Sequence, residues 1–176
     1  MLKSSGLTAV ATALVGVGVF ALASQVRAGG DKVAFPATYD KGVLFTTVDR
    51  ADIKQFREFY TSQAALDAAK KGQPLPSGTV ITMVQWKAKL DAAGNPEKGP
   101  DGHFVKGDLN GYAVMEKRTG WGTEYPDNIR NGEWEYQAFT PAKAVNAAAK
   151  LNTCFECHLP KKSDDYVFLY GKMAGK

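Results

Sequence analysis

The residues best suited to chemistry stand together near the carboxyl end of the chain, in the sequence Cys-Phe-Glu-Cys-His at positions 154–158. The chain has no other cysteine, and its one other histidine is His103. Residues three and four positions apart lie on the same side of a helix, so Cys154, Cys157 and His158 would point in one direction. Two thiols could then bond a flat organic group while the imidazole reaches a metal ion at its centre.

The spacing C-x-x-C-H is the attachment sequence of c-type haem, in which two sulfurs bond the vinyl groups and the histidine ligates the iron. A zinc site would need four ligands, and adjacent Cys157 and His158 fit poorly in one tetrahedron. A thioredoxin-like pair normally follows a strand in a parallel βαβ unit, whereas this pair follows successive strands. We therefore predict one covalent haem on Cys154, Cys157 and His158, with disulfide chemistry as the main alternative.

The first 28 residues have the pattern of a secretory signal peptide. Lys3 supplies a positive start, residues 6–23 form an apolar run, and small residues precede a cleavage site after Ala28 or, alternatively, after Ala23. An uncleaved anchor is the other interpretation, although the run is short for a bilayer span. We predict export to the periplasm, with no membrane span left after cleavage and one domain over residues 29–176. Covalent haem attachment also takes place outside the cytoplasm, which agrees with export.

The charge of the chain does not favour nucleic acid as a partner. Removing residues 1–28 takes away Lys3 and Arg27 and lowers the formal net charge from +4 by two. The remaining basic residues are spread along the chain, so their pairs are better explained as solvated faces than as a phosphate-binding stripe.

The patterns that must position the motif indicate strands first and helices last, which favours an α+β fold. Runs of β-branched and aromatic residues predict strands over residues 41–48, 79–86, 109–117 and 133–140. Glycine and proline predict a loop over 88–108 and a turn-rich segment over 119–132. For residues 53–60, periodicity alone does not choose between a helix and a strand.

Three helices are predicted from propensity and capping. Residues 62–71 are helix formers, with Ser62 as the cap, and the alanine-rich run 142–150 follows Thr140 and Pro141. A third helix begins at Cys154, where Thr153 and Glu156 form a capping box.

The late C-x-x-C-H after a strand-rich body resembles the cytochrome P-460 and cytochrome c′-β family. That resemblance implies a five-stranded antiparallel sheet with the haem packed against it, and it favours a strand for residues 53–60. Besides the attachment motif, it rests on Phe35-Pro36, Gly78-Thr79-Val80, Gly120-Trp121-Gly122, Trp134 and Asp165-Tyr166-Val167-Phe168, and so covers nearly all of residues 29–176.

In cytochromes P-460 a strand lysine is bonded to the haem, and the enzymes oxidise hydroxylamine. The position that we match to this lysine is Met83, and nearby Lys87 and Lys89 do not fit the pattern. Members of the c′-β branch lack the bond, have an apolar distal face and bind nitric oxide or carbon monoxide at open iron. The resemblance therefore implies a haem-pocket position for Met83 and nitric oxide as ligand. Hydroxylamine oxidation is the alternative.

Other residues remain candidates for the surroundings of the haem. Met83 or Met115 could be a sixth iron ligand in an electron carrier, although core filling is the more common role. His103 could reach the haem or another metal, but a loop histidine needs no such role. We also expect a homodimer and a redox partner such as another cytochrome. The expected apolar shell is Phe45, Phe56, Phe59, Trp86, Tyr112, Trp134 and Tyr136, and the candidate propionate partners are Arg57, Lys117 and Arg118.

Overall fold

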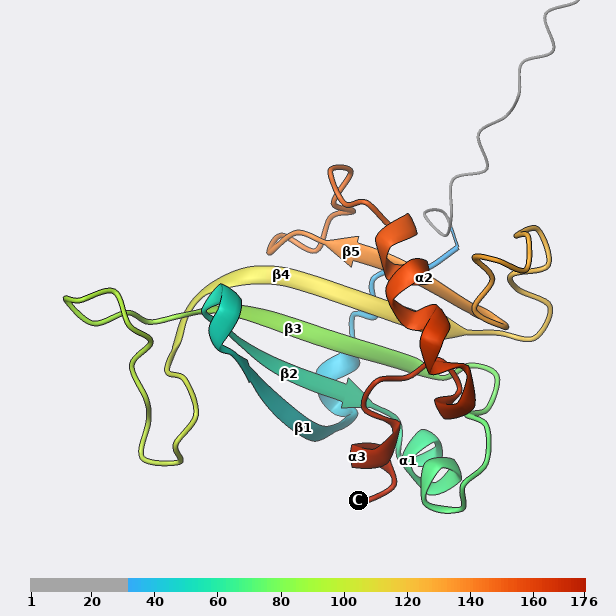
Figure 1. Ribbon diagram of the computed structural model, residues 1–176, viewed down its shortest axis with the longest axis horizontal. Helices are drawn as coiled ribbons and strands as arrows, with labels where there is room; N and C mark the ends of the chain where they lie inside the picture. The colour runs from blue at the N-terminus through green and yellow to red at the C-terminus, as the bar shows by residue number, and fades with distance from the viewer. Residues whose placement is uncertain (1–31) are drawn as a thin grey trace, which may run out of the picture.

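The computed structural model describes residues 32–176, and in this part of the chain five strands form one antiparallel sheet (Figure 1). Each strand pairs with the next along the chain, an order that hairpins and short connections can make. The predicted α+β class is confirmed. The strand expected over residues 53–60 begins at Gln55, because Ala51–Ile53 form a 3₁₀ turn and Lys54 is left-handed. The signal peptide predicted for residues 1–28 lies outside the described residues. The strands are β1 (Val43–Arg50), β2 (Gln55–Thr61), β3 (Val80–Ala88), β4 (Lys106–Lys117) and β5 (Trp134–Phe139).

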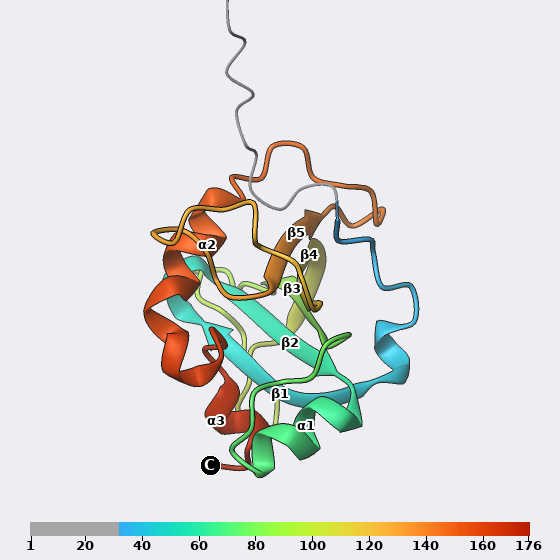
Figure 2. The ribbon, with the colours of Figure 1, turned by 90° about the vertical axis from the view of Figure 1, so that its right-hand side faces the viewer.

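The two faces of the sheet are covered by different parts of the chain. Helices α2 (Asn152–His158) and α3 (Tyr170–Met173) lie on one face, joined by the 3₁₀ segment Leu159–Asp164. Figure 2, with the sheet seen from one end, places the segment that precedes β1 on the other face. Helix α1 (Gln63–Lys70) packs beside α3, and the Ala65 N–H donates to the Ser62 hydroxyl, which confirms the predicted cap.

Each face carries its own hydrophobic core. Ile81 on β3, Met115 on β4 and Tyr136 on β5 are neighbours across the strands, and they pack with Phe155 of α2. Side chains alternate along a strand, so their neighbours in sequence point to the opposite face. There the core consists of Val33, Val84, Tyr112, Val114 and Phe139.

The predicted helix over residues 142–150 is wrong. The chain turns sharply after β5, with Lys143 in the left-handed region at φ 64°, and Val145 forms a bridge with Phe139. The Asn146 N–H donates to the Ala138 carbonyl at 2.9 Å. Hydrogen bonds to the free edge of β5 therefore override the helical propensity of the alanines.

The predicted capping box is also wrong. Helix α2 begins at Asn152, so Thr153 lies inside it, and Leu151 at the N-cap has helical dihedral angles. The Thr153 N–H donates to the Lys150 carbonyl in a turn that leads into the helix. Because this turn starts the helix earlier, no capping hydrogen bond from a side chain is seen in the described residues around α2.

The loop predicted over residues 88–108 is shorter than expected because β4 already begins at Lys106. Its backbone forms two successive turns, in which Asp91 N–H donates to Asn95 and Gly99 N–H donates to His103. The loop projects from one end of the sheet, away from α2 and α3 (Figure 1).

Candidate haem site

Helix α2 carries the whole attachment motif, and Phe155 anchors this helix to the sheet. Phe155 is fully buried, with its ring centroid 5.1 Å from that of Tyr125 and 4.8 Å from that of Tyr136. Cys154 is half-buried and Cys157 is exposed, and both are free thiols in the described structure. The motif therefore lies on a helix, as predicted, and Phe155 holds this helix against the sheet.

The imidazole of His158 is held in the form that a metal ligand requires. Its Nδ1 lies 2.6 Å from the carbonyl oxygen of Tyr166. Because a carbonyl oxygen can only accept, Nδ1 carries the proton, and Nε2 keeps a lone pair for a metal. Burial lowers the pKa of His158, which favours the neutral ring. The ring packs between Tyr136 and Phe168, at centroid distances of 4.9 and 5.1 Å.

Beside α2, the sheet presents an apolar wall on the same face. Met83 lies two residues from Ile81 on β3 and therefore points to the side of α2. Its neighbours across the strands are Phe59 on β2 and Ala113 on β4, and Phe45 packs near Phe59 at a ring distance of 6.3 Å. The helices α2 and α3 lie over one end of the strands in Figure 1, and no described helix lies over the other end on this face. A flat apolar group beside α2 would contact this wall.

The wall becomes polar two residues further along. Arg57 on β2 pairs with Gln85 on β3, and its guanidinium donates to the Gln55 side-chain oxygen at 3.0 and 3.2 Å. Burial lowers the pKa of Arg57, and the neighbouring Arg50 cation adds to this effect. Among residues 32–176, no carboxylate forms an ion pair with Arg57. An anionic group placed at this end of the wall would meet the half-buried Arg57 cation, which has no carboxylate partner among the described residues.

The other two candidate propionate partners are already paired. Lys117 lies 2.9 Å from the Asp165 carboxylate, and Arg118 lies 2.5 Å from the Glu116 carboxylate. Of the three candidates, Arg57 therefore remains the one available to an added carboxylate within the described structure.

His103 does not lie near the motif. Its Nδ1 is 3.1 Å from the Asp49 carboxylate, and its ring packs near Phe56. Asp49 and Phe56 are paired in the sheet, next to the pair of Val48 and Arg57. Because side chains alternate along a strand and Arg57 lies on the face of α2, Asp49 and Phe56 face away from α2. The suggestion that His103 reaches the haem is therefore wrong.

The predicted aromatic shell divides between the two faces. Phe45, Phe59, Trp134 and Tyr136 lie on the face of α2. The remaining three rings belong to the opposite face because strand side chains alternate. These are Phe56, Trp86 and Tyr112. Met115 is buried in the core beneath α2 and fills space there.

Two positioning groups were missed by sequence reasoning. Asn131 is fully buried, and its amide donates to the Phe155 carbonyl at 3.1 Å and to the Tyr136 hydroxyl at 2.9 Å. The Tyr166 carbonyl, which fixes the tautomer of His158, is a backbone atom. Neither role leaves a signal in residue type, since an asparagine in a turn-rich segment is ordinary.

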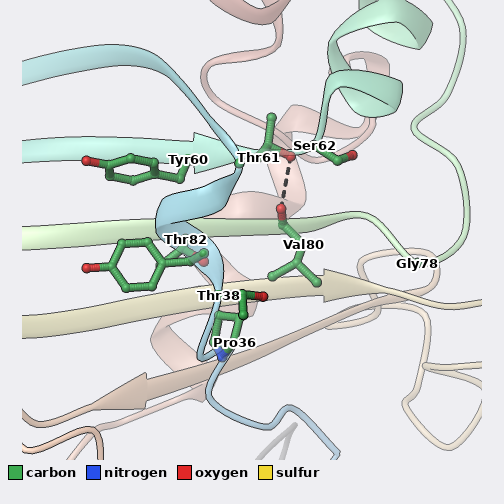
Figure 3. Close-up of a pocket in the computed structure, with 10 residues that line it drawn as sticks. Pro36, Thr38, Tyr60, Thr61, Ser62, Gly78, Val80 and Thr82 are labelled. Carbon is green, nitrogen blue, oxygen red and sulfur yellow. Dashed lines mark hydrogen bonds between the residues drawn. The ribbon is translucent and has the colours of Figure 1, made fainter.

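A separate cavity of about 240 Å³ lies on the opposite face (Figure 3). Its described lining consists of hydroxyl-bearing and small residues and includes no cysteine or histidine. The Thr61 hydroxyl donates to the Val80 carbonyl at 2.9 Å at the rim. This cavity therefore lacks the ligands for a haem.

The comparison with known families agrees with the site. The model of the Cytochrome P460 family matches residues 36–169, which include the whole sheet, α2 and the turn that contacts His158. The chain belongs to the cytochrome P460 family. No individual curated protein matches it. Membership in the P460 family implies a haem cofactor, and two free thiols, a free Nε2 and an apolar wall beside them fit that cofactor.

Within residues 32–176, no helix has both the length and the apolar character needed to cross a bilayer.

Proposed function

We propose that this chain is an exported c-type cytochrome with one haem bonded to Cys154 and Cys157 and with His158 Nε2 as the iron ligand. The observation that carries the proposal is the 2.6 Å contact between His158 Nδ1 and the Tyr166 carbonyl. It leaves Nε2 free on the same helix as two free thiols, beside an uncovered apolar part of the sheet. The P460 family match supports a haem in this place.

The ligand that we propose is a diatomic molecule such as nitric oxide. The bound haem would supply an iron with one open coordination position. Phe59, Met83 and Ala113 would exclude water from the side of the sheet, because none of them donates a strong hydrogen bond. Arg57, two residues along β2 from Phe59, has no carboxylate partner in the described residues, and it would bind a propionate or an anionic ligand.

The first experiment is optical spectroscopy of the purified haem protein, oxidised and reduced, with and without nitric oxide. We expect a five-coordinate high-spin ferrous spectrum that changes when nitric oxide is added. A six-coordinate low-spin ferrous spectrum without added ligand would contradict the open position. The Met83→Ala variant would then identify the sixth ligand. Met115→Ala serves as the matched control because Met115 is buried beneath α2.

The P460 family match also favours a second candidate, oxidation of hydroxylamine with transfer of electrons to a partner cytochrome. Methionine at position 83 does not favour it, because a thioether cannot form the lysine bond of cytochromes P-460. Mass spectrometry and turnover assays test this candidate. A haem held through two thioethers alone, with no turnover of hydroxylamine, would eliminate it.

Export by residues 1–28 remains part of the proposal. Cell fractionation after expression of the full chain should place the haem-containing protein in the periplasm, without residues 1–28. A cytoplasmic haem protein that retains them would contradict this proposal.

A further inference from the structure

The turn that contacts His158 has an unusual backbone. Asp165 and Tyr166 are consecutive residues with positive φ, at 51° and 61°. Residues other than glycine adopt this region reluctantly, and two in succession need contacts elsewhere to hold them. The Tyr166 carbonyl that accepts from His158 Nδ1 belongs to this turn. The turn therefore determines where the acceptor lies.

The contacts that hold the turn converge on the carboxylate of Asp165. Lys117 Nζ on β4 donates to both of its oxygens at 2.9 Å, and the Leu75 N–H donates to one of them at 2.8 Å. The Lys117 and Asp165 side chains are only 11% and 14% exposed. Solvent screens such a pair weakly, so it ties the turn firmly to the sheet.

The rest of the turn is fixed by packing. The Tyr166 N–H donates to the Lys161 carbonyl at 2.7 Å. Its ring lies against Gly132, where an added Cβ would be 3.1 Å from a ring carbon. These contacts limit rotation of Tyr166. The Asp165 N–H also donates to the Lys161 carbonyl, and the Asp165 carboxylate is what joins the turn to β4 and to Leu75.

We propose that the buried Lys117–Asp165 ion pair is a positioning device for His158: it holds the Tyr166 carbonyl against Nδ1 and thereby sets how strongly the imidazole donates to iron. The proposal rests on the proposed function, in which Nε2 binds the haem iron. A hydrogen bond at Nδ1 makes the imidazole a stronger donor, which favours ferric iron and stiffens the bond from iron to histidine. Asp165 and Lys117 are thus positioning residues that touch neither the haem ligand nor the iron.

The test compares Asp165→Asn with Lys117→Met in the haem-loaded protein. If only their charges mattered, loss of the carboxylate would raise the reduction potential and loss of the ammonium would lower it. If they position the carbonyl, both variants raise the potential, and both lower the iron–histidine stretching frequency in resonance Raman spectra of the ferrous protein. We expect a change of roughly tenfold in the reduction equilibrium, taken from the lower end of the loss in metal affinity or activity that follows mutation of groups supporting a metal ligand.

Two further variants make the comparison decisive. Lys117→Arg keeps the ion pair and should retain the wild-type frequency. Arg118→Gln breaks the neighbouring pair with Glu116 and should leave the frequency unchanged, because that pair does not contact the turn. Opposite shifts of potential in Asp165→Asn and Lys117→Met, an unchanged frequency in both, or a Lys117→Arg variant that behaves like Lys117→Met would each overturn the proposal.

The wild-type protein separates this test from the proposed function. If it binds no haem, or if its spectra show that His158 is not a ligand, the proposed function fails before any variant is compared. If wild type has the expected histidine-ligated haem and the variants do not shift together, only the positioning role fails.

Discussion

Replacement of Asn131 by alanine should loosen the attachment helix from the sheet. Asn131 is fully buried, and its amide makes the hydrogen bonds that join the segment before β5 to Phe155 and Tyr136. Loss of two hydrogen bonds costs about 2 kcal/mol, at roughly 1 kcal/mol each. The space left by the side chain adds about 1 kcal/mol. We therefore expect the free energy of unfolding to fall by about 3 kcal/mol.

The assay is denaturant and thermal unfolding of Asn131→Ala, with Asn128→Ala as the control. Asn128 is exposed in the same segment, so its replacement should change the free energy of unfolding by less than about 0.5 kcal/mol. For a domain of this size, the loss at Asn131 corresponds to a fall in Tm of about 6–12 °C.

The haem yield provides a second measure, because α2 carries both cysteines. We expect less covalent haem in Asn131→Ala than in Asn128→Ala when both are expressed under the same conditions. If Asn131→Ala is within about 0.5 kcal/mol of wild type, the buried amide does not hold α2, and the reasoning above is wrong.

Three further predictions concern other parts of the fold. Phe155→Ala should lower the free energy of unfolding, measured with denaturant, by about 3–5 kcal/mol. Phe168 is half-exposed, so Phe168→Ala should lower it by about 1 kcal/mol or less. Equal losses in the two variants would contradict the packing argument. Burial raises the pKa of Glu135. The protonated carboxyl therefore stabilises the fold fully at a pH below the ordinary glutamate pKa, and this stabilisation is lost as the pH rises through the raised pKa. The Tm of Glu135→Gln relative to that of wild type should therefore rise as the pH increases above the ordinary glutamate pKa of about 4.3, and a constant difference would refute this. Arg57→Gln should lower the reduction potential of the haem protein more than Arg50→Gln does, because the charge of Arg50 is already balanced by Asp52. Equal shifts of potential in the two variants would count against an anion bound at Arg57.

Much of the sheet is predictable from residue types. The run of valine, isoleucine and threonine at the start of β3 favours a strand because both faces of β3 are buried, and the structure confirms it. The same burial explains why residues 53–60 are ambiguous. Phe56 packs on one face and Phe59 points to the other, so β2 has no simple alternation of apolar and polar residues.

The alanine-rich segment shows what propensity leaves out. Residues 142–150 favour a helix locally, but the edge of β5 offers hydrogen-bonding partners that lie far from any local pattern. Tertiary pairing decided this segment, and no window of sequence contains that information.

The site was predictable only in its chemistry. The spacing of Cys154, Cys157 and His158 predicts a haem motif, because that spacing acts within one helix turn. The acceptor for His158 is a backbone carbonyl in a left-handed turn, and the wall around Met83 depends on strand register. Both depend on how distant parts of the chain meet, so the sequence could name Met83 and the candidate aromatic residues but not which of those residues share its face.

The most direct test of the account is mass spectrometry of the protein produced with its first 28 residues in a host that attaches c-type haem. The account predicts one haem bonded to the peptide that contains Cys154 and Cys157, and its loss from the variant in which both are alanine. A colourless protein in which both thiols can still be alkylated would contradict the central claim.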